Sequence, residues 1–149
     1  MGMRTWTGVN LVVLLAGCAS VSPAQDPDYL KAEAMMAQQR QDAVVTCVGK
    51  TQCDKAWALT RVYVSERSAT KVQLSTDTLI ETYGPVDRVT VSLRAVRTPG
   101  PGDTQTIEIG ANCRGMYAPG GGPGSFYIPC IKQVVPHVVQ FRPFVQARL

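Results

Sequence analysis

The alternation of apolar and polar residues is clearest in the middle of the chain. Apolar side chains occupy every second position over residues 89–95 and again over most of residues 105–111, with mostly polar side chains between them. Alternation of this kind is typical of a β-strand with one buried face. Residues 98–103 separate the two stretches and are rich in proline and glycine, so the pattern predicts a long antiparallel hairpin.

The same alternation restricts how the two strands of the hairpin pair. Side chains alternate between faces, so paired residues must share a face and their numbers must add up to an even value. A turn centred on Pro101 places Leu93 opposite Ile109, and it places Arg94 opposite Glu108 as an opposite-charge pair. Registers shifted by two residues keep the same buried face and stay open.

Two further strands are predicted before the hairpin. Residues 70–75 alternate, and residues 78–83 are rich in β-forming side chains and end at the turn signal Gly84-Pro85. Residues 43–47 are interpreted as a short strand or an extended lead-in to the next helix. Residues 126–128 are interpreted as a short returning strand after a glycine-rich segment.

Helical patterns lie on both sides of these strands. Asp26 and Pro27 predict a helix start, and the run to residue 42 is rich in helix formers but has a thin apolar stripe. Residues 52–66 carry a clear amphipathic stripe, on which Trp57 is expected to belong to the core. Residues 131–149 favour two short helices, the second opened by Pro136, although their valine content also suits a strand.

This order of elements predicts an α+β fold. Strands grouped together and helices at the ends favour an antiparallel sheet of about four strands with helices packed on one face. Residues 28–149 are long enough for a single domain with one core.

The N-terminal segment has the pattern of a bacterial export signal. Arg4 precedes an apolar run over residues 9–16, which only Asn10 interrupts and which is too short to cross a bilayer. The run ends in Leu15-Ala16-Gly17-Cys18, which resembles the lipobox of Gram-negative envelope lipoproteins. The resemblance implies a signal peptide at residues 1–17, a diacylated Cys18 and a tether over residues 18–27. A plain secretory signal and an uncleaved anchor are the alternatives.

Charge and the residue after Cys18 narrow the location and the partners. The formal net charge is +4, and Arg4 is the only charged residue that would be removed with the signal. This net positive charge is too small to indicate a nucleic-acid partner. Ala19 stands where aspartate favours inner-membrane retention under the enterobacterial sorting rule, so the resemblance implies the periplasmic face of the outer membrane.

The other four cysteines indicate a disulfide-stapled domain. Cys47, Cys53, Cys113 and Cys130 are an even number in a predicted oxidising compartment. Three pairings exist, and we favour the local ones, Cys47–Cys53 and Cys113–Cys130, because each brackets one connection. Zinc is the competing interpretation, but it prefers C-x₂₋₄-C, whereas these spacings are C-x₅-C and C-x₁₆-C. No metal or cofactor is therefore predicted.

The sequence indicates no catalytic residue. His137 is the only histidine, and neither a G-x-S-x-G motif nor a clustered carboxylate pair accompanies it. Residues 115–124 are glycine-rich but lack the G-x-x-x-x-G-K-[ST] of a phosphate-binding loop, so a flexible surface loop is expected. We therefore expect a non-enzymatic, lipid-anchored protein with a binding or structural role in the envelope or in a secretion or assembly complex. The alternative is an envelope hydrolase acting on glycan or peptide.

Overall fold

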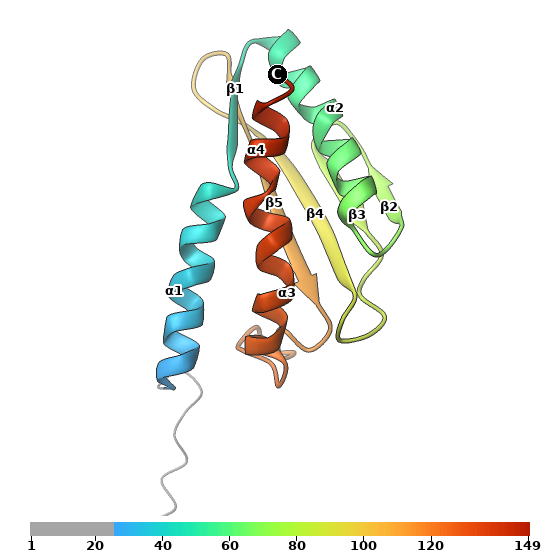
Figure 1. Ribbon diagram of the computed structural model, residues 1–149. Helices are drawn as coiled ribbons and strands as arrows, with labels where there is room; N and C mark the ends of the chain where they lie inside the picture. Colours follow the sequence, from blue (N-terminus) through green and yellow to red (C-terminus); the bar gives the residue numbers. More distant parts are fainter. Residues whose placement is uncertain (1–25) are drawn as a thin grey trace, which may run out of the picture.

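Five antiparallel strands form one sheet in the computed structural model, which describes residues 26–149 (Figure 1). The strands are β1 (Val45–Val48), β2 (Val72–Ser75), β3 (Leu79–Thr82), β4 (Val91–Pro99) and β5 (Thr104–Cys113). Their order across the sheet is β1-β5-β4-β3-β2. The predicted α+β class is confirmed, and the strand beyond the predicted four is β1, which pairs with β5 at one edge.

Helices cover one face of this sheet. They are α1 (Pro27–Asp42), α2 (Lys50–Arg67), α3 (Tyr127–Val139) and α4 (Phe141–Gln146). In Figure 1, α2 lies in front of one half of the sheet and the α3–α4 pair in front of the other, while α1 lies beside α3. Asp26 caps α1 by accepting a hydrogen bond from the Asp28 backbone N–H at 2.9 Å, as the sequence predicts.

The hairpin of β4 and β5 has the predicted faces but a different register. The residues of β4 and β5 that point toward the helices are buried, and they are Val91, Leu93, Ala95, Ile107, Ile109 and Cys113. Leu93, however, pairs with Ala111 and Arg94 with Gly110, two residues from the predicted partners. The turn residues explain the shift. Pro101 has a fixed φ and Gly102 has a φ of 60°, so the chain reverses over residues 100–103.

The register change gives Arg94 a different ion-pair partner. Its Nε lies 3.0 Å from the Glu81 carboxylate on β3, whereas Glu108 lies opposite Val96. The predicted Arg94–Glu108 pairing is therefore wrong.

Two further local predictions are wrong. Residues 126–128, expected as a strand, include the N-cap and first turn of α3, and Pro129 fits there because a first-turn N–H has no helical partner. Two C-terminal helices are present as predicted, but Pro136 lies inside α3 and the break comes at Gln140. Pro136 is exposed and near the helix end, where its lost hydrogen bond disturbs little of the helix.

Both predicted disulfides are formed. Cys47–Cys53 joins β1 to α2 with a Cα–Cα distance of 5.1 Å, and Cys113–Cys130 joins β5 to α3 at 5.9 Å. The predicted signal peptide, Cys18 and most of the tether lie outside the described residues. None of the helices within residues 26–149 is long and apolar enough to cross a membrane.

Candidate functional site

A charged cleft of about 590 Å³ lies between α2, the β2–β3 turn and the far end of the β4–β5 hairpin. The residues that line it are Lys50, Asp54, Trp57, Arg61, Asp77, Thr78, Arg97, Pro99 and Gln105. We call this feature the charged cleft.

Helix α2 forms one wall of the charged cleft because four of its lining residues share a face. Lys50, Asp54, Trp57 and Arg61 follow one another at intervals of four, three and four residues, which is the spacing of one helical face. Trp57 is 2 % exposed and belongs to the core, as predicted. The charged residues therefore form the outer margin of the stripe that packs α2 on the sheet.

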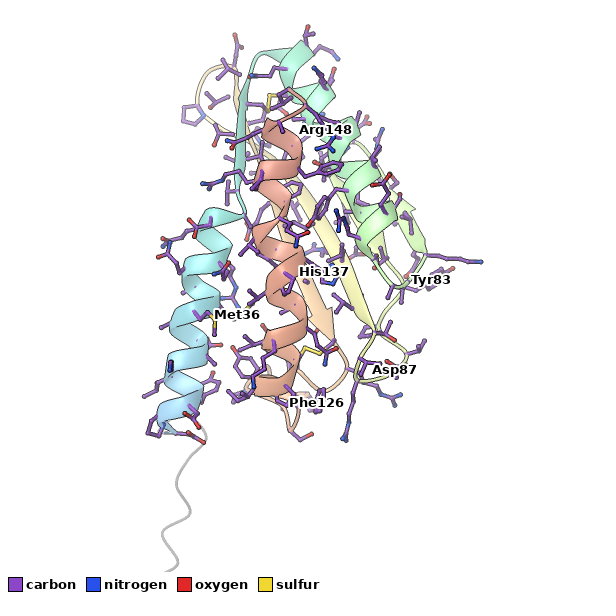
Figure 2. All side chains as sticks on the ribbon, viewed as in Figure 1. Met36, Tyr83, Asp87, Phe126, His137 and Arg148 are labelled. Atoms are coloured by element: carbon purple, nitrogen blue, oxygen red, sulfur yellow. A yellow bond between two sulfur atoms is a disulfide. The ribbon has the colours of Figure 1, made fainter. Side chains whose placement is uncertain are left out.

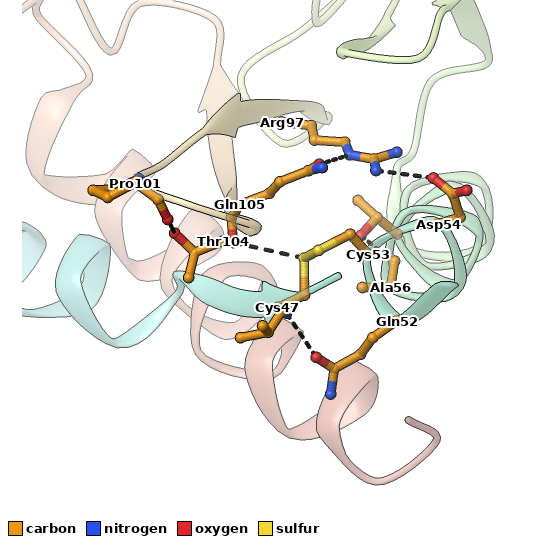
Figure 3. The surroundings of a disulfide bond; sticks show 11 residues. Cys47, Gln52, Cys53, Asp54, Ala56, Arg97, Pro101, Thr104 and Gln105 are labelled. Atoms are coloured by element: carbon orange, nitrogen blue, oxygen red, sulfur yellow. Dashed lines mark hydrogen bonds and ion pairs between the residues drawn. A yellow bond between two sulfur atoms is a disulfide. The ribbon is translucent and has the colours of Figure 1, made fainter. Parts of the chain in front are cut away.

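Asp54 is held by two cations at the start of α2. It forms an ion pair with Lys50, and Arg97 Nη2 donates to its Oδ1 at 2.9 Å. Arg97 Nε also donates to the Gln105 side chain, and Figure 3 shows Arg97 placed between Asp54 and Gln105. The Lys50 ammonium, followed by the Arg97 guanidinium, lowers the pKa of Asp54 below its usual value. Asp54 is therefore a fixed carboxylate at neutral pH.

The other end of the charged cleft is organised by the β2–β3 turn. Arg61 Nη2 donates to the Thr76 carbonyl oxygen at 2.9 Å and lies 3.5 Å from Asp77. Trp57 Nε1 donates to the same carbonyl oxygen at 3.0 Å, so two side chains of α2 hold this turn. Arg61 Nε is buried and has no hydrogen-bond partner within residues 26–149.

The disulfide Cys47–Cys53 fixes the part of α2 that supplies Lys50 and Asp54. Cys53 is buried and precedes Asp54 directly, and its partner Cys47 sits on β1 beside Gln105 of β5 (Figure 3). The disulfide therefore ties the helical wall of the charged cleft to the sheet. The predicted disulfide residues thus serve the cleft only as supports.

The lowered pKa of Asp54 makes this side chain poorly suited to the role of general acid. Hydrolysis of a glycan with two carboxyl groups commonly requires one that is protonated at neutral pH, and hence a raised pKa. Asp54 and Asp77 are the two carboxylates of the cleft, and the pKa of Asp54 is shifted in the opposite direction.

His137 lies away from this cleft. It is half-buried on α3, and burial, followed by the Arg67 charge, lowers its pKa. Its backbone oxygen accepts a hydrogen bond from the Tyr63 hydroxyl at 2.6 Å. His137 is therefore not among the residues that line the charged cleft.

Sequence reasoning missed the charged cleft, although it left a signal. Arg97 and Gln105 continue the odd-numbered positions that form the buried face of β4 and β5. A charged side chain and an amide at positions where the pattern predicts apolar side chains indicate a polar site on the inner face of the sheet. Arg97 is only 11 % exposed, so its charge needs the partners that Asp54 and Gln105 supply.

Residues 26–149 contain no group of three or more histidine, cysteine, aspartate or glutamate side chains placed to hold a metal ion. No family model, curated protein or solved structure matches the chain.

Proposed function

We propose that this protein is a lipoprotein of the Gram-negative envelope, anchored through Cys18 at the periplasmic face of the outer membrane. One observation carries the proposal. The four cysteines of the described residues are all used in two disulfides, while the fifth cysteine of the sequence ends the lipobox-like stretch Leu15-Ala16-Gly17-Cys18. Disulfides form and persist in the periplasm, which supports export, and the lipobox-like stretch supports acylation after export.

The protein acts as a binding component rather than an enzyme. Its charged cleft is open and is lined by ionised side chains of both signs, so it suits a polar, charged segment of another envelope protein. Arg61 and Asp77 form the longest of its ion pairs, at 3.5 Å, and the Arg61 side chain is 43 % exposed, so its guanidinium can be reached by an incoming acceptor. A partner carboxylate meeting Arg61 would gain a charge-assisted hydrogen bond there.

Mass spectrometry of the mature protein tests the anchor. The N-terminal peptide should begin at Cys18 and carry the mass of the added acyl chains, and the protein should fractionate with outer membranes. The Cys18→Ala variant should lose both the acyl mass and the membrane fraction. A mature chain cut elsewhere, with a free Cys18 thiol, would exclude the anchor.

Crosslinking in intact envelopes tests the charged cleft. Arg61→Ala should lower the yield of the crosslinked partner, whereas Arg94→Ala should not. Arg94 is a matched control because it also pairs with a carboxylate, at 3.0 Å, but on the opposite face of the sheet. Equal yields of crosslinked partner from the two variants would show that the cleft does not bind the partner.

A glycan or peptide hydrolase is the second candidate, favoured only by the presence of Asp54 and Asp77 in one cleft. Purified lipoprotein incubated with peptidoglycan should release neither new reducing ends nor new amines. Release that Asp54→Asn and Asp77→Asn both abolish would replace the binding proposal with the hydrolase.

A further inference from the structure

One end of the molecule gathers three segments that are far apart in the sequence. Figure 1 shows the first turn of α1, the connection between β3 and β4, and the glycine-rich loop before α3 at the same end. Contacts link them in a row. Tyr29 of α1 lies 5.1 Å from Tyr127, measured between ring centroids, and the Arg88 guanidinium lies 5.3 Å from the ring of Phe126. We call this end the anchor-side end, because the chain leads from it toward Cys18.

The β3–β4 connection exposes two valines on a well-fixed loop. Val86 is 70 % exposed and Val89 is 72 % exposed. Asp87 between them accepts hydrogen bonds from the backbone N–H groups of Val89 and Thr90 at 2.9 and 2.7 Å. Bonds to neighbouring segments hold the loop further, so the valines are presented by a built structure.

Those further bonds come from Arg114, which directly precedes the glycine-rich loop, and from α3. Arg114 Nη1 donates to the Val86 carbonyl oxygen at 2.8 Å, and Gln133 Nε2 donates to the Arg88 carbonyl oxygen at 3.1 Å. The connection is thereby fixed to the segments on either side of it.

More apolar surface continues across the anchor-side end. Leu30 in the first turn of α1 is 54 % exposed, and Tyr117 of the glycine-rich loop is 44 % exposed. Tyr117 packs on Tyr127, with 5.9 Å between the ring centroids. Arg88 lies over the ring of Phe126, Arg114 bonds to the Val86 carbonyl oxygen, and both arginines are exposed. Apolar and aromatic side chains flanked by arginine are the composition of surfaces that lie in a membrane interface.

We propose that the anchor-side end rests on the lipid bilayer, with Val86 and Val89 in the interfacial layer and Arg88 and Arg114 at the lipid phosphates. The inference rests on the proposed lipid anchor at Cys18. The chain between Cys18 and Asp26 spans at most about 29 Å when fully extended. The first turn of α1 is therefore held close to the membrane, and the exposed loops share its end of the molecule.

Quenching of tryptophan fluorescence by brominated lipids tests this contact in the full lipoprotein. Val89→Trp places the probe in the loop, and Val48→Trp is the matched control. Val48 is 59 % exposed and ends β1, next to the start of α2 and remote from the anchor-side end (Figure 1). The native Trp57 is 2 % exposed, so it adds a constant background. The vesicles contain phosphatidylethanolamine and phosphatidylglycerol with brominated acyl chains.

We expect bromine to reduce the added emission of Val89→Trp by about half or more and that of Val48→Trp by less than about a tenth. Flotation with the vesicles and intact mass report the anchor separately. If the protein floats and neither probe is quenched, or both are quenched alike, the membrane contact is excluded while the anchor stands. If the protein neither floats nor carries acyl chains, the proposed function fails and the inference with it.

A second copy of the chain is the other occupant that the experiment detects. A blue-shifted Val89→Trp emission without bromine quenching, together with crosslinked dimers, would place the loop against a neighbouring copy and overturn the proposal. Because Val89 is exposed, thermal unfolding of Val89→Trp should match the wild type, which keeps misfolding from mimicking any of these outcomes.

Discussion

Tyr63 is the residue at which α2 meets the two C-terminal helices. Its ring is fully buried and packs edge-on against Phe141 and Phe144, with 5.4 and 5.1 Å between ring centroids. Its hydroxyl donates to the backbone oxygen of His137 in the last turn of α3. A helix carbonyl so close to the C-terminus has no partner within its own helix, so the tyrosine completes it.

Tyr63→Phe should lower the free energy of unfolding by about 1–2 kcal/mol, because the ring packing remains while one buried hydrogen bond is lost. Urea unfolding followed by circular dichroism measures this. Tyr83→Phe is the control, since Tyr83 is 55 % exposed and should change little. Equal stability of wild type and Tyr63→Phe would show that the hydroxyl contributes nothing.

His137 should make the protein less stable in mild acid. Its pKa in the folded state lies below the ordinary 6.5, because burial and then Arg67 disfavour the charged ring. As the pH falls below 6.5, the unfolded chain binds a proton that the folded chain resists. The stability that the protein has above that pH is therefore lost as the pH falls through the pKa of His137 in the folded state.

His137→Gln should therefore flatten the dependence of the unfolding free energy on pH between 7.5 and 5. The carboxylates with lowered pKa, Asp54 and Asp87, lose stability only below their ordinary value of 3.8, so this window reports the histidine. NMR titration checks the same shift directly, since His137 is the chain's only histidine. A titration midpoint at or above 6.5 would contradict the argument.

At the scale of elements, the glycine-rich loop is a packed turn closed at its base by Cys113–Cys130. The loop residues bond to one another: Gly124 N–H donates to the Met116 oxygen at 2.8 Å, and Phe126 N–H to the Gly115 oxygen at 3.0 Å. A Cβ at Gly124 would meet the backbone of Gly115 and Tyr117 at 3.0 Å or less. The flexible loop predicted from composition is thus internally bonded, because its glycines let two stretches of backbone approach closely.

Gly124→Ala should cost about 1–3 kcal/mol, because backbone must move to admit the methyl group. Gly120→Ala should cost nothing measurable, since a Cβ there meets no atom within 4 Å. Thermal unfolding of the two variants side by side checks the difference. Indistinguishable unfolding transitions would mean that the loop backbone shifts to admit the methyl group at no measurable cost.

The sequence predicted elements well and their mutual placement less well. The period-two pattern gave both hairpin strands and their buried faces, since burial alone decides which residues point inward. It left the register open by two residues, because both registers bury the same side chains and the turn at Pro101-Gly102 decides between them.

Hydrophobic periodicity could not predict the charged cleft, for a different reason. Arg97 meets Asp54 across 43 residues of sequence, and no local pattern connects a strand end to a helix start over that distance. Only the misplaced polarity of Arg97 and Gln105 on an inner face pointed to it.

At the scale of the whole molecule, the fold separates its two surfaces of interest. α2 begins at the end of the molecule opposite the first turn of α1, and the charged cleft includes that beginning (Figure 1). A domain held at the first turn of α1 would therefore present the start of α2 away from the membrane. Figure 2 shows Arg148, near the C-terminus, at that far end and Phe126 at the anchor-side end.

The two disulfides hold these two ends, one at each. Cys47–Cys53 joins β1 to α2 beside the charged cleft, with a sequence separation of 6, and Cys113–Cys130 joins β5 to α3 at the anchor-side end, with a separation of 17. In the chain-entropy model, closing the longer loop restricts the unfolded chain more. Replacing both cysteines of a pair by alanine should thus cost about 2 kcal/mol for Cys47–Cys53 and about 3 kcal/mol for Cys113–Cys130.

Loss of each disulfide should also affect a different functional readout. Loss of Cys47–Cys53 frees the start of α2 and should weaken partner crosslinking at the charged cleft, while Val89→Trp quenching stays intact. Loss of Cys113–Cys130 frees the loop that braces Val86 through Arg114, so it should reduce the quenching and leave crosslinking unchanged. Measurements at a temperature where both variants remain folded make the comparison valid. If either variant impaired both readouts equally, the two ends would not be independent, and the disulfides would act only through global stability.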